Sequence, residues 1–309
     1  MTQAPPVLAP YPPEDFDEFW DGVLAARARR PPAYIREHDP DDDVPGHRIE
    51  RIDFKGDAGQ LLHGWIAIPD GVPLPAPAFL WLPAYGNESH PPDEYSCYPG
   101  FVSMSFNLHG LPAFHEEPYV PEKGYLSRGL EGPDTWVYRT VVLDALRGLD
   151  ILAVQPEVIP EKLFCAGLSQ GGGLAVMLAA LSDRLRAACG DLPFLAAMPW
   201  TIRKAAYRYP YKEMKDFADA RALGMETVLS TLSYYDTVNM ATRAKCPVQV
   251  SYGSKDPACP PNTVLAVYDA LPEPKRLIAY EGLGHDWHHE MPRNNAAWMR
   301  THMEYFHRV

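Results

Sequence analysis

A serine flanked by glycines, in the run Gly167-Leu168-Ser169-Gln170-Gly171, is the feature of this sequence with the clearest chemical meaning. Residues 162–168 before it form a short apolar run, which predicts a strand, and residues 172–181 after it are rich in Ala and Leu, which predicts a helix. A sharp turn between strand and helix leaves no room for bulky neighbours, so glycines beside the serine are expected. The N-terminus of the helix then offers free N–H groups to a developing oxyanion. Ser169 is therefore predicted to be a nucleophile, with a structural glycine-rich turn as the alternative.

A serine hydroxyl attacks only when a base removes its proton, so a histidine and an acid that orients it must be found. Where G-x-S-x-G stands on a strand–turn–helix, the acid and then the histidine follow the serine along the chain. Asp256 follows the predicted strand 247–252, and His285 follows the predicted strand 276–280. Loops at the carboxyl ends of parallel strands are where catalytic groups gather in open α/β sheets. Asp256 is therefore predicted as the acid and His285 as the base, with a capping aspartate and an ordinary loop histidine as the alternatives.

Three other histidines could serve different roles. His288 and His289 stand in the run HDWHHE, for which a metal site is a second interpretation. Ligand histidines usually come at fixed spacing with further ligands elsewhere, and the sequence shows no such partner set, so neither a metal nor a cofactor is predicted. His109 follows the predicted strand 101–108 and is a candidate for the substrate pocket, with a packed loop histidine as the alternative.

An oxyanion hole needs two N–H donors, one from the residue after the nucleophile and one from a loop after an earlier strand. Gln170 is the residue after Ser169. The loop that begins at Pro83 directly follows the predicted strand 76–82, and Tyr85 lies in it. The main-chain N–H groups of Gln170 and Tyr85 are therefore the predicted donors.

The elements that must position these residues follow from the periodicity of apolar side chains. Residues 12–29 have the pattern of an amphipathic helix, and the alternating segments 47–54 and 61–68 predict a hairpin. From residue 76 onward strands and helices alternate, which implies a mostly parallel central sheet with helices on both faces, as in the α/β-hydrolase fold. The further predicted strands are 76–82, 101–108, 162–168, 247–252 and 276–280, and the further predicted helices are 135–153 and 172–181.

A single domain, 1–309, accounts for these elements. Residues 1–70 are predicted to extend it with the N-terminal helix and the hairpin. Residues from about 200 to 244 are helical in period and rich in Tyr, Lys and Arg, which predicts a helical insertion beside the sheet. Residues 109–134 show no clear periodicity, and loops of that length are usually functional or disordered.

The composition excludes several classes of partner. The formal net charge is −12, with 28 basic and 40 acidic residues, whereas nucleic acids and anionic membranes require basic patches. No run approaches the ~18 apolar residues of a membrane span, and the first residues lack the basic start and apolar stretch of a secretory signal. The five cysteines are scattered and contain no CxxC pair, which favours a reduced, cytoplasmic setting. They are Cys97, Cys165, Cys189, Cys246 and Cys259.

Four blocks of the sequence carry a family resemblance. The opening run PPEDFDEFW resembles the N-terminal helix of the acetyl xylan esterase and cephalosporin-C deacetylase group, carbohydrate esterase family seven. The blocks GLSQGGGLA, CPVQVSYGSKDPACPPNTV and YEGLGHD are similar to that family's motifs in order and spacing, and the resemblance covers nearly the whole chain. It implies a serine esterase that removes short acyl groups, chiefly acetyl, from esters of sugars or small alcohols. It also implies oxyanion donors at Tyr85 and Gln170, and a homo-oligomer.

Two segments depart from the family pattern. Pro83-Ala84-Tyr85 stands where members usually carry His-Gly-Tyr, and Leu108-His109-Gly110-Leu111 stands where they carry Arg-Gly-Gln. Pro83 and His109 are therefore the candidate residues of an altered substrate pocket. The three triad residues are retained, so hydrolysis is still expected. A serine hydrolase of another ester or amide, and a non-catalytic binding or scaffold protein of the same fold, are the alternatives.

Overall fold

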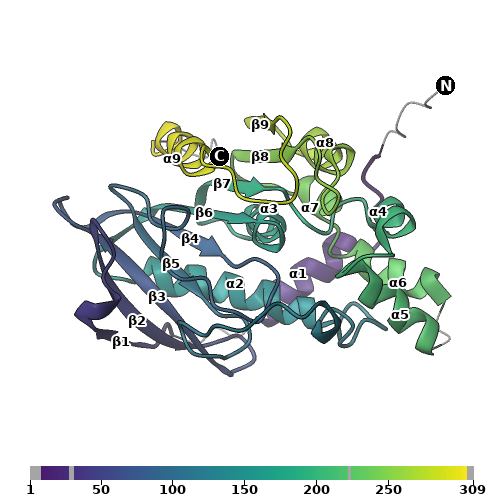
Figure 1. The fold of residues 1–309 in the computed structure, drawn as a ribbon, viewed down its shortest axis with the longest axis horizontal. Coiled ribbons are helices and arrows are strands. Elements are labelled where there is room, and N and C mark those ends of the chain that lie inside the picture. Colours follow the sequence, from purple (N-terminus) through teal and green to yellow (C-terminus); the bar gives the residue numbers. More distant parts are fainter. Residues whose placement is uncertain (1–7, 28–30, 222–223, 305–309) are drawn as a thin grey trace.

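One mixed sheet forms the centre of the molecule (Figure 1). The computed structural model describes residues 8–27, 31–221 and 224–304, and within these ranges nine strands pair in the order β1-β2-β3-β5-β4-β6-β7-β8-β9. The six strands from β5 to β9 in that order are parallel, while β1, β2 and β3 are antiparallel and β3 joins β5. The strands are β1 (Tyr34–His38), β2 (His47–Lys55), β3 (Leu61–Pro69), β4 (Ala76–Leu82), β5 (Val102–Phe106), β6 (Val158–Leu168), β7 (Leu185–Asp191), β8 (Val248–Gly253) and β9 (Lys275–Tyr280).

Helices cover both faces of this sheet, as the alternation of elements predicted. Along β4, Ala78, Leu80 and Leu82 face a core formed with α2 (Val137–Ala153), α3 (Gln170–Leu181) and α8 (Pro261–Ala270). The intervening Phe79 and Trp81 face a second core formed with α9 (Met291–Thr301). Figure 1 shows α2 and α9 on opposite sides of the strands. Because β4 is buried on both faces, its sequence is continuously apolar instead of alternating.

The N-terminal part of the chain adds a helix and a hairpin. The helix α1 (Phe16–Ala26) buries Phe16, Trp20 and Val23 on one side, and the Trp20 indole donates a 2.8 Å hydrogen bond to the Tyr234 carbonyl. The prediction placed this helix at 12–29, of which residues 28 and 29 lie outside the described ranges. Strands β2 and β3 pair antiparallel over their whole length, so the predicted hairpin is confirmed.

The chain between β7 and β8 is helical. It contains α4 (Met198–Ala205), α5 (Tyr211–Arg221), α6 (Gly224–Ser233) and α7 (Thr237–Ala241), of which α5 and α6 lie beyond the end of the sheet (Figure 1). The buried carboxylate of Asp236 ties this segment together. It accepts hydrogen bonds from the main-chain N–H groups of Ala197, Met198 and Val238, at 2.9, 2.7 and 2.9 Å. One acidic side chain thus caps α7 and fixes the start of α4.

Two strands were absent from the sequence prediction. Strand β7 was missed because its sequence, LRAACGD, has charged residues at its second and last positions and only small ones between, although the strand is almost entirely buried. Strand β1 is an edge strand with mostly exposed polar residues. The strands predicted at 247–252 and 276–280 are present as β8 and β9, but the predicted set of strands was incomplete without β1 and β7. The helices α8 and α9 were not predicted either. Two short 3-10 helices, Pro40–Asp42 and Pro121–Lys123, complete the elements.

Among the described residues, no helix is long and apolar enough to cross a membrane. The longest one, α2, has 17 residues and carries charged side chains.

Candidate active site

Ser169 stands on the sharp turn that joins β6 to α3. Its φ of 58° lies in the left-handed region, which costs energy in a residue with a side chain and persists only where the surroundings enforce it. The surroundings here are main chain on both sides. A Cβ at Gly171 would lie 2.1 Å from the Leu82 carbonyl oxygen, and one at Gly167 would lie 2.6 Å from the main chain of Gly171. The two glycines therefore allow β6, α3 and the end of β4 to approach closely around the serine.

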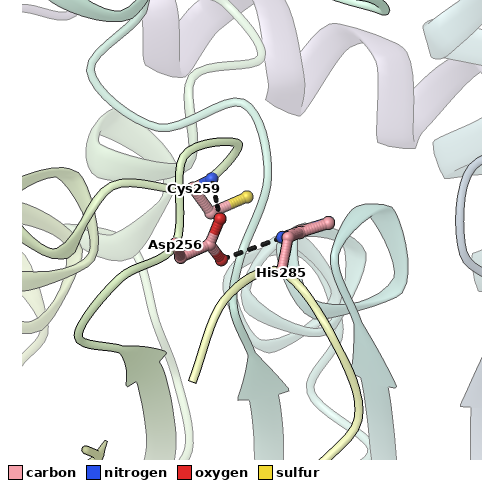
Figure 2. Close-up of side chains that lie close together, drawn as sticks. All are labelled: Asp256, Cys259 and His285. Carbon is pink, nitrogen blue, oxygen red and sulfur yellow. Dashed lines mark hydrogen bonds and ion pairs between the residues drawn. The ribbon is translucent and has the colours of Figure 1, made fainter. Parts of the chain in front are cut away.

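The structure brings together the three residues predicted as a triad. His285, in the loop after β9, places Nε2 2.9 Å from the Ser169 hydroxyl oxygen and Nδ1 2.8 Å from a carboxylate oxygen of Asp256. Figure 2 shows the Asp256–His285 pair. An ionised carboxylate only accepts hydrogen bonds, so Nδ1 carries the proton and Nε2 is free to accept the proton of the serine. The Asp256 side chain is fully buried, while that of His285 is 26% exposed.

The loop after β8 holds Asp256 in this orientation. Its second carboxylate oxygen accepts hydrogen bonds from the main-chain N–H groups of Ala258 and Cys259, at 2.7 and 2.9 Å. Figure 2 shows the bond from Cys259. These charge-assisted bonds leave only one carboxylate oxygen for the imidazole. The direction of the Asp256–His285 bond is thus set by the fold of residues 256–259.

The predicted oxyanion donors belong to Gln170, directly after the serine, and to Tyr85, which lines the same cavity as Ser169. In the part of the chain that the structure describes, the main-chain N–H groups of Tyr85 and Gln170 donate to no other residue. The Gln170 side chain joins their two loops, since its oxygen accepts a 2.8 Å bond from the Tyr125 hydroxyl and its nitrogen lies 3.4 Å from the Ala84 carbonyl. The Tyr85 ring packs on Tyr125, with centroids 4.8 Å apart. The arrangement leaves both N–H groups available, and their role stays a prediction.

A cavity of about 280 Å³ is lined by Ser169 and His285. Its other walls include the aromatic side chains of Tyr85, Tyr119, Phe194 and Tyr209, and the side chain of Arg208. Tyr119 belongs to the long stretch without periodicity, and Arg208 and Tyr209 belong to the junction of α4 and α5. The sequence interpretation named none of these three as site residues. The length of the segment 109–134 was the one signal that pointed toward Tyr119, because long loops are commonly functional.

Two predicted pocket residues do not line this cavity. Pro83 is buried directly after β4, and neither Pro83 nor His109 is among the residues that line the cavity. The His109 ring contacts the Gly86 carbonyl through Nε2 at 2.6 Å and packs edge-on against Tyr125, with centroids 4.6 Å apart. Burial lowers the pKa of His109 below its usual value, so the neutral ring donates this bond. The packed loop histidine, the alternative in the sequence analysis, describes His109.

The neighbouring histidines do not join the triad. His288 stacks on the rings of Tyr280 and His289, with centroids 4.4 Å apart in both pairs. Within the described residues, the group with metal-ligand atoms close together is Asp256, Cys259 and His285, all within 4.8 Å of one another (Figure 2). Both carboxylate oxygens of Asp256 already accept hydrogen bonds from the protein. The donor set therefore fits a hydrogen-bonded triad without requiring an ion.

Comparison with known proteins places the chain in a family. The family model described as Acetyl xylan esterase (AXE1) matches residues 9–302. The chain belongs to this acetyl xylan esterase family. The predicted family is thereby confirmed, and the match includes all the elements that position Ser169, Asp256 and His285.

Individual relatives agree with this placement. The acetyl esterase Axe7A of Xylanibacter ruminicola is 29% identical over 289 residues, which are 89% of this chain; the chain spans 64% of the length of that relative. The structure of an acetyl xylan esterase from Paenibacillus sp. R4 matches with a TM-score of 0.82 and 29% identity, over 96% of each chain. That of acetyl xylan esterase 1 from Thermoanaerobacterium sp. JW/SL YS485 matches with a TM-score of 0.82 and 26% identity, over 95% of each chain. The predicted α/β-hydrolase fold is confirmed.

Proposed function

We propose that this chain is a serine esterase that removes short acyl groups, chiefly acetyl, from esters of sugars or other small alcohols. The observation that carries the proposal is the continuous hydrogen-bonded series from Ser169 through His285 to Asp256. Such a series is what acyl transfer requires, since the hydroxyl must lose its proton as it attacks. Membership of the acetyl xylan esterase family supports both the reaction and the acyl group.

The reaction has two steps. In the first, the Ser169 oxygen attacks the ester carbonyl while Nε2 of His285 takes the hydroxyl proton, and the imidazolium then gives that proton to the leaving alcohol. Asp256 holds the imidazole in the required tautomer and stabilises its positive charge. The N–H groups of Gln170 and Tyr85 are proposed to bind the oxyanion of the tetrahedral intermediate. In the second step His285 activates a water molecule, which hydrolyses the acyl-enzyme and releases the acid.

The size of the cavity supports a small substrate. Its volume of about 280 Å³ is near the lower limit for pockets that hold drug-sized ligands, which run from roughly 300 to 1,000 Å³. Aromatic walls suit the flat apolar faces of a sugar ring. We therefore propose acetylated sugars as the main class of substrate, in agreement with the names of the relatives.

The replacement Ser169→Ala tests the proposal. It should abolish hydrolysis of p-nitrophenyl acetate and also labelling by a fluorophosphonate probe. Ser105→Ala provides the matched control, because the Ser105 hydroxyl is buried in β5 and bonds to none of the described residues. The Ser105→Ala control should retain both the hydrolysis and the labelling. Undiminished hydrolysis by Ser169→Ala would refute the assignment of the nucleophile. A wild-type chain that neither hydrolyses esters nor binds the probe would favour a non-catalytic role.

The acyl preference can be measured separately with p-nitrophenyl esters of increasing chain length. A fall in kcat/KM from acetate to butyrate and longer chains is expected, and a preference for long chains would contradict the proposed substrate class.

We further propose that the chain works as a homo-oligomer in the cytoplasm. The five cysteines, all within the described ranges, are free and buried, which supports a reducing compartment. Light scattering on the purified protein would test the assembly, and a monomeric mass would contradict it. Fractionation of the producing cells would test the compartment.

A further inference from the structure

Arg208 is a cation in the wall of the cavity that contains Ser169. It lies in the turn between α4 and α5, next to the aromatic ring of Tyr209, and it is half-buried. Its main chain takes part in local turns, donating to the Ala205 carbonyl and accepting from the N–H of Lys212. Main-chain hydrogen bonds thus hold the segment that carries the guanidinium of Arg208.

The guanidinium of Arg208 forms no hydrogen bond or ion pair with any other residue that the structure describes. Glu213 is the acidic residue nearest to Arg208 in the sequence, and its carboxylate already has other partners. Glu213 accepts hydrogen bonds from the Tyr85 hydroxyl at 3.1 Å and from the Ser127 N–H at 2.7 Å, one with each carboxylate oxygen. None of the guanidinium nitrogens of Arg208 is among the fully buried atoms without a partner, so the donors still reach solvent and are free to bind an anion.

Carboxylates lie near Tyr119, which shares the wall of the cavity with Arg208. The pKa of Tyr119 is raised by burial and by the carboxylates of Glu213 and Glu88, and Arg208 acts on it in the opposite direction. The whole chain has a formal net charge of −12. Arg208 is therefore a positive charge in the wall of the cavity that contains Ser169, close enough to Tyr119 to oppose the effect of these carboxylates.

We propose that Arg208 forms an anion-binding subsite that selects acetyl esters whose alcohol part carries a carboxylate, such as an acetylated uronic acid. The inference rests on the proposed esterase activity of the same site. The guanidinium fork matches the two oxygens of a carboxylate, and the aromatic neighbours can pack on the ring that bears it. A singly charged carboxylate matches the single Arg or Lys side chain among the described residues that line the cavity, whereas a phosphate group carries further negative charge.

A pair of matched esters tests the subsite. 4-Acetoxybenzoate and 4-acetoxybenzamide carry the same acetyl group on rings of the same size, and only the first has a negative charge. The quantity to measure is the ratio of their kcat/KM values. Arg208→Gln should lower this ratio by about tenfold, as expected for the loss of a charge-assisted contact. Arg208→Lys should give an intermediate ratio, because it keeps the charge but loses the fork.

Arg203→Gln is the matched control. Arg203 lies on α4, five residues before Arg208, is exposed and bonds to the Pro199 carbonyl instead of lining the cavity. The Arg203→Gln variant removes the same charge as Arg208→Gln and should leave the ratio of the two kcat/KM values unchanged. If Arg208→Gln lowers hydrolysis of both esters in proportion, or changes neither, the subsite is refuted while the esterase activity stands. If the wild type hydrolyses neither these esters nor p-nitrophenyl acetate, the proposed function itself fails.

Discussion

The two sides of the cavity are constructed differently. The triad side consists of Ser169, Asp256 and His285 on short loops at the carboxyl ends of β6, β8 and β9, held by contacts to main chain. The opposite side, here called the outer wall, consists of Tyr85, Tyr119, Arg208 and Tyr209, which come from three separate segments. Hydrogen bonds and ring contacts between side chains, such as that of Tyr85 with Glu213, help to hold the outer wall.

The difference bears on what each side can tolerate. A main-chain contact cannot move without moving a strand or a helix, so the positions of the residues on the triad side are tightly fixed. A side-chain contact can change with one substitution and leave the sheet intact. We therefore expect substitutions on the triad side to abolish activity, and substitutions on the outer wall to change selectivity or local stability.

The largest effect is expected from Asp256→Asn. The amide oxygen would stay with the N–H groups of Ala258 and Cys259, so the amide nitrogen would face His285. That contact forces the proton onto Nε2, which can then no longer accept the proton of Ser169. We expect kcat for p-nitrophenyl acetate to fall by about 10³- to 10⁴-fold with little change in stability. Asp286→Asn, the same change at the exposed residue next to His285, is the control; equal losses in both variants would contradict the orienting role of Asp256.

Gly171→Ala should show how tightly the main chain surrounds the serine. The added Cβ would lie 2.1 Å from the Leu82 carbonyl oxygen, so β4 or α3 must move. We expect a loss of about 3 kcal/mol or more in the free energy of unfolding, measured with urea, together with loss of activity. Gly22→Ala serves as comparison, because a Cβ there meets nothing within 4 Å and the residue lies in α1. It should gain about 1 kcal/mol. A Gly171→Ala protein as stable as the wild type would show that the turn is not constrained as described.

Asp236→Asn tests the support of the outer wall and has a defined dependence on pH. Burial raises the pKa of Asp236 to about 6, from 3.8 for the free side chain. Between these values the folded chain holds a proton that the unfolded chain has lost, so this group's contribution to stability falls as pH rises. The free energy of unfolding of the wild type should therefore exceed that of Asp236→Asn most near pH 4. This difference should shrink by on the order of 2 kcal/mol by pH 7. Thermal unfolding across this range would measure it, and an advantage that grows with pH would contradict it.

Tyr85→Phe should have the smallest effect. It removes the hydroxyl that donates to Glu213 but keeps the ring and the main-chain N–H proposed for the oxyanion hole. We expect a stability loss of about 1 kcal/mol and a change of less than about threefold in kcat for p-nitrophenyl acetate. A loss comparable to that of Asp256→Asn would show that the Tyr85 side chain takes part in the chemistry.

The triad side could be predicted from the sequence because its signals are local. The serine motif, the strand before it and the helix after it stand together in the chain, and Asp256 and His285 each follow a predicted strand. Parallel strands end at one edge of a sheet, so their order along the chain is enough to bring these residues together. The prediction did not need β7, although β7 lies between β6 and β8 and its Asp191 carbonyl accepts the Ser169 N–H at 2.9 Å.

The outer wall could not be predicted in the same way. His109 follows a strand as Asp256 does, yet its ring bonds to Gly86 and leaves the cavity, because position at a strand end does not set the direction of a side chain. Arg208 gave no signal of its own in a segment rich in Tyr, Lys and Arg.

The sequence by itself determined the fold class, the family and the identity of Ser169, Asp256 and His285 as partners, since these depend on periodicity and on the order of motifs. Only the tertiary structure decided which side chains face Ser169. That depends on how segments more than 80 residues apart pack, as Tyr119 and Arg208 do in the cavity wall, and no local pattern encodes such contacts.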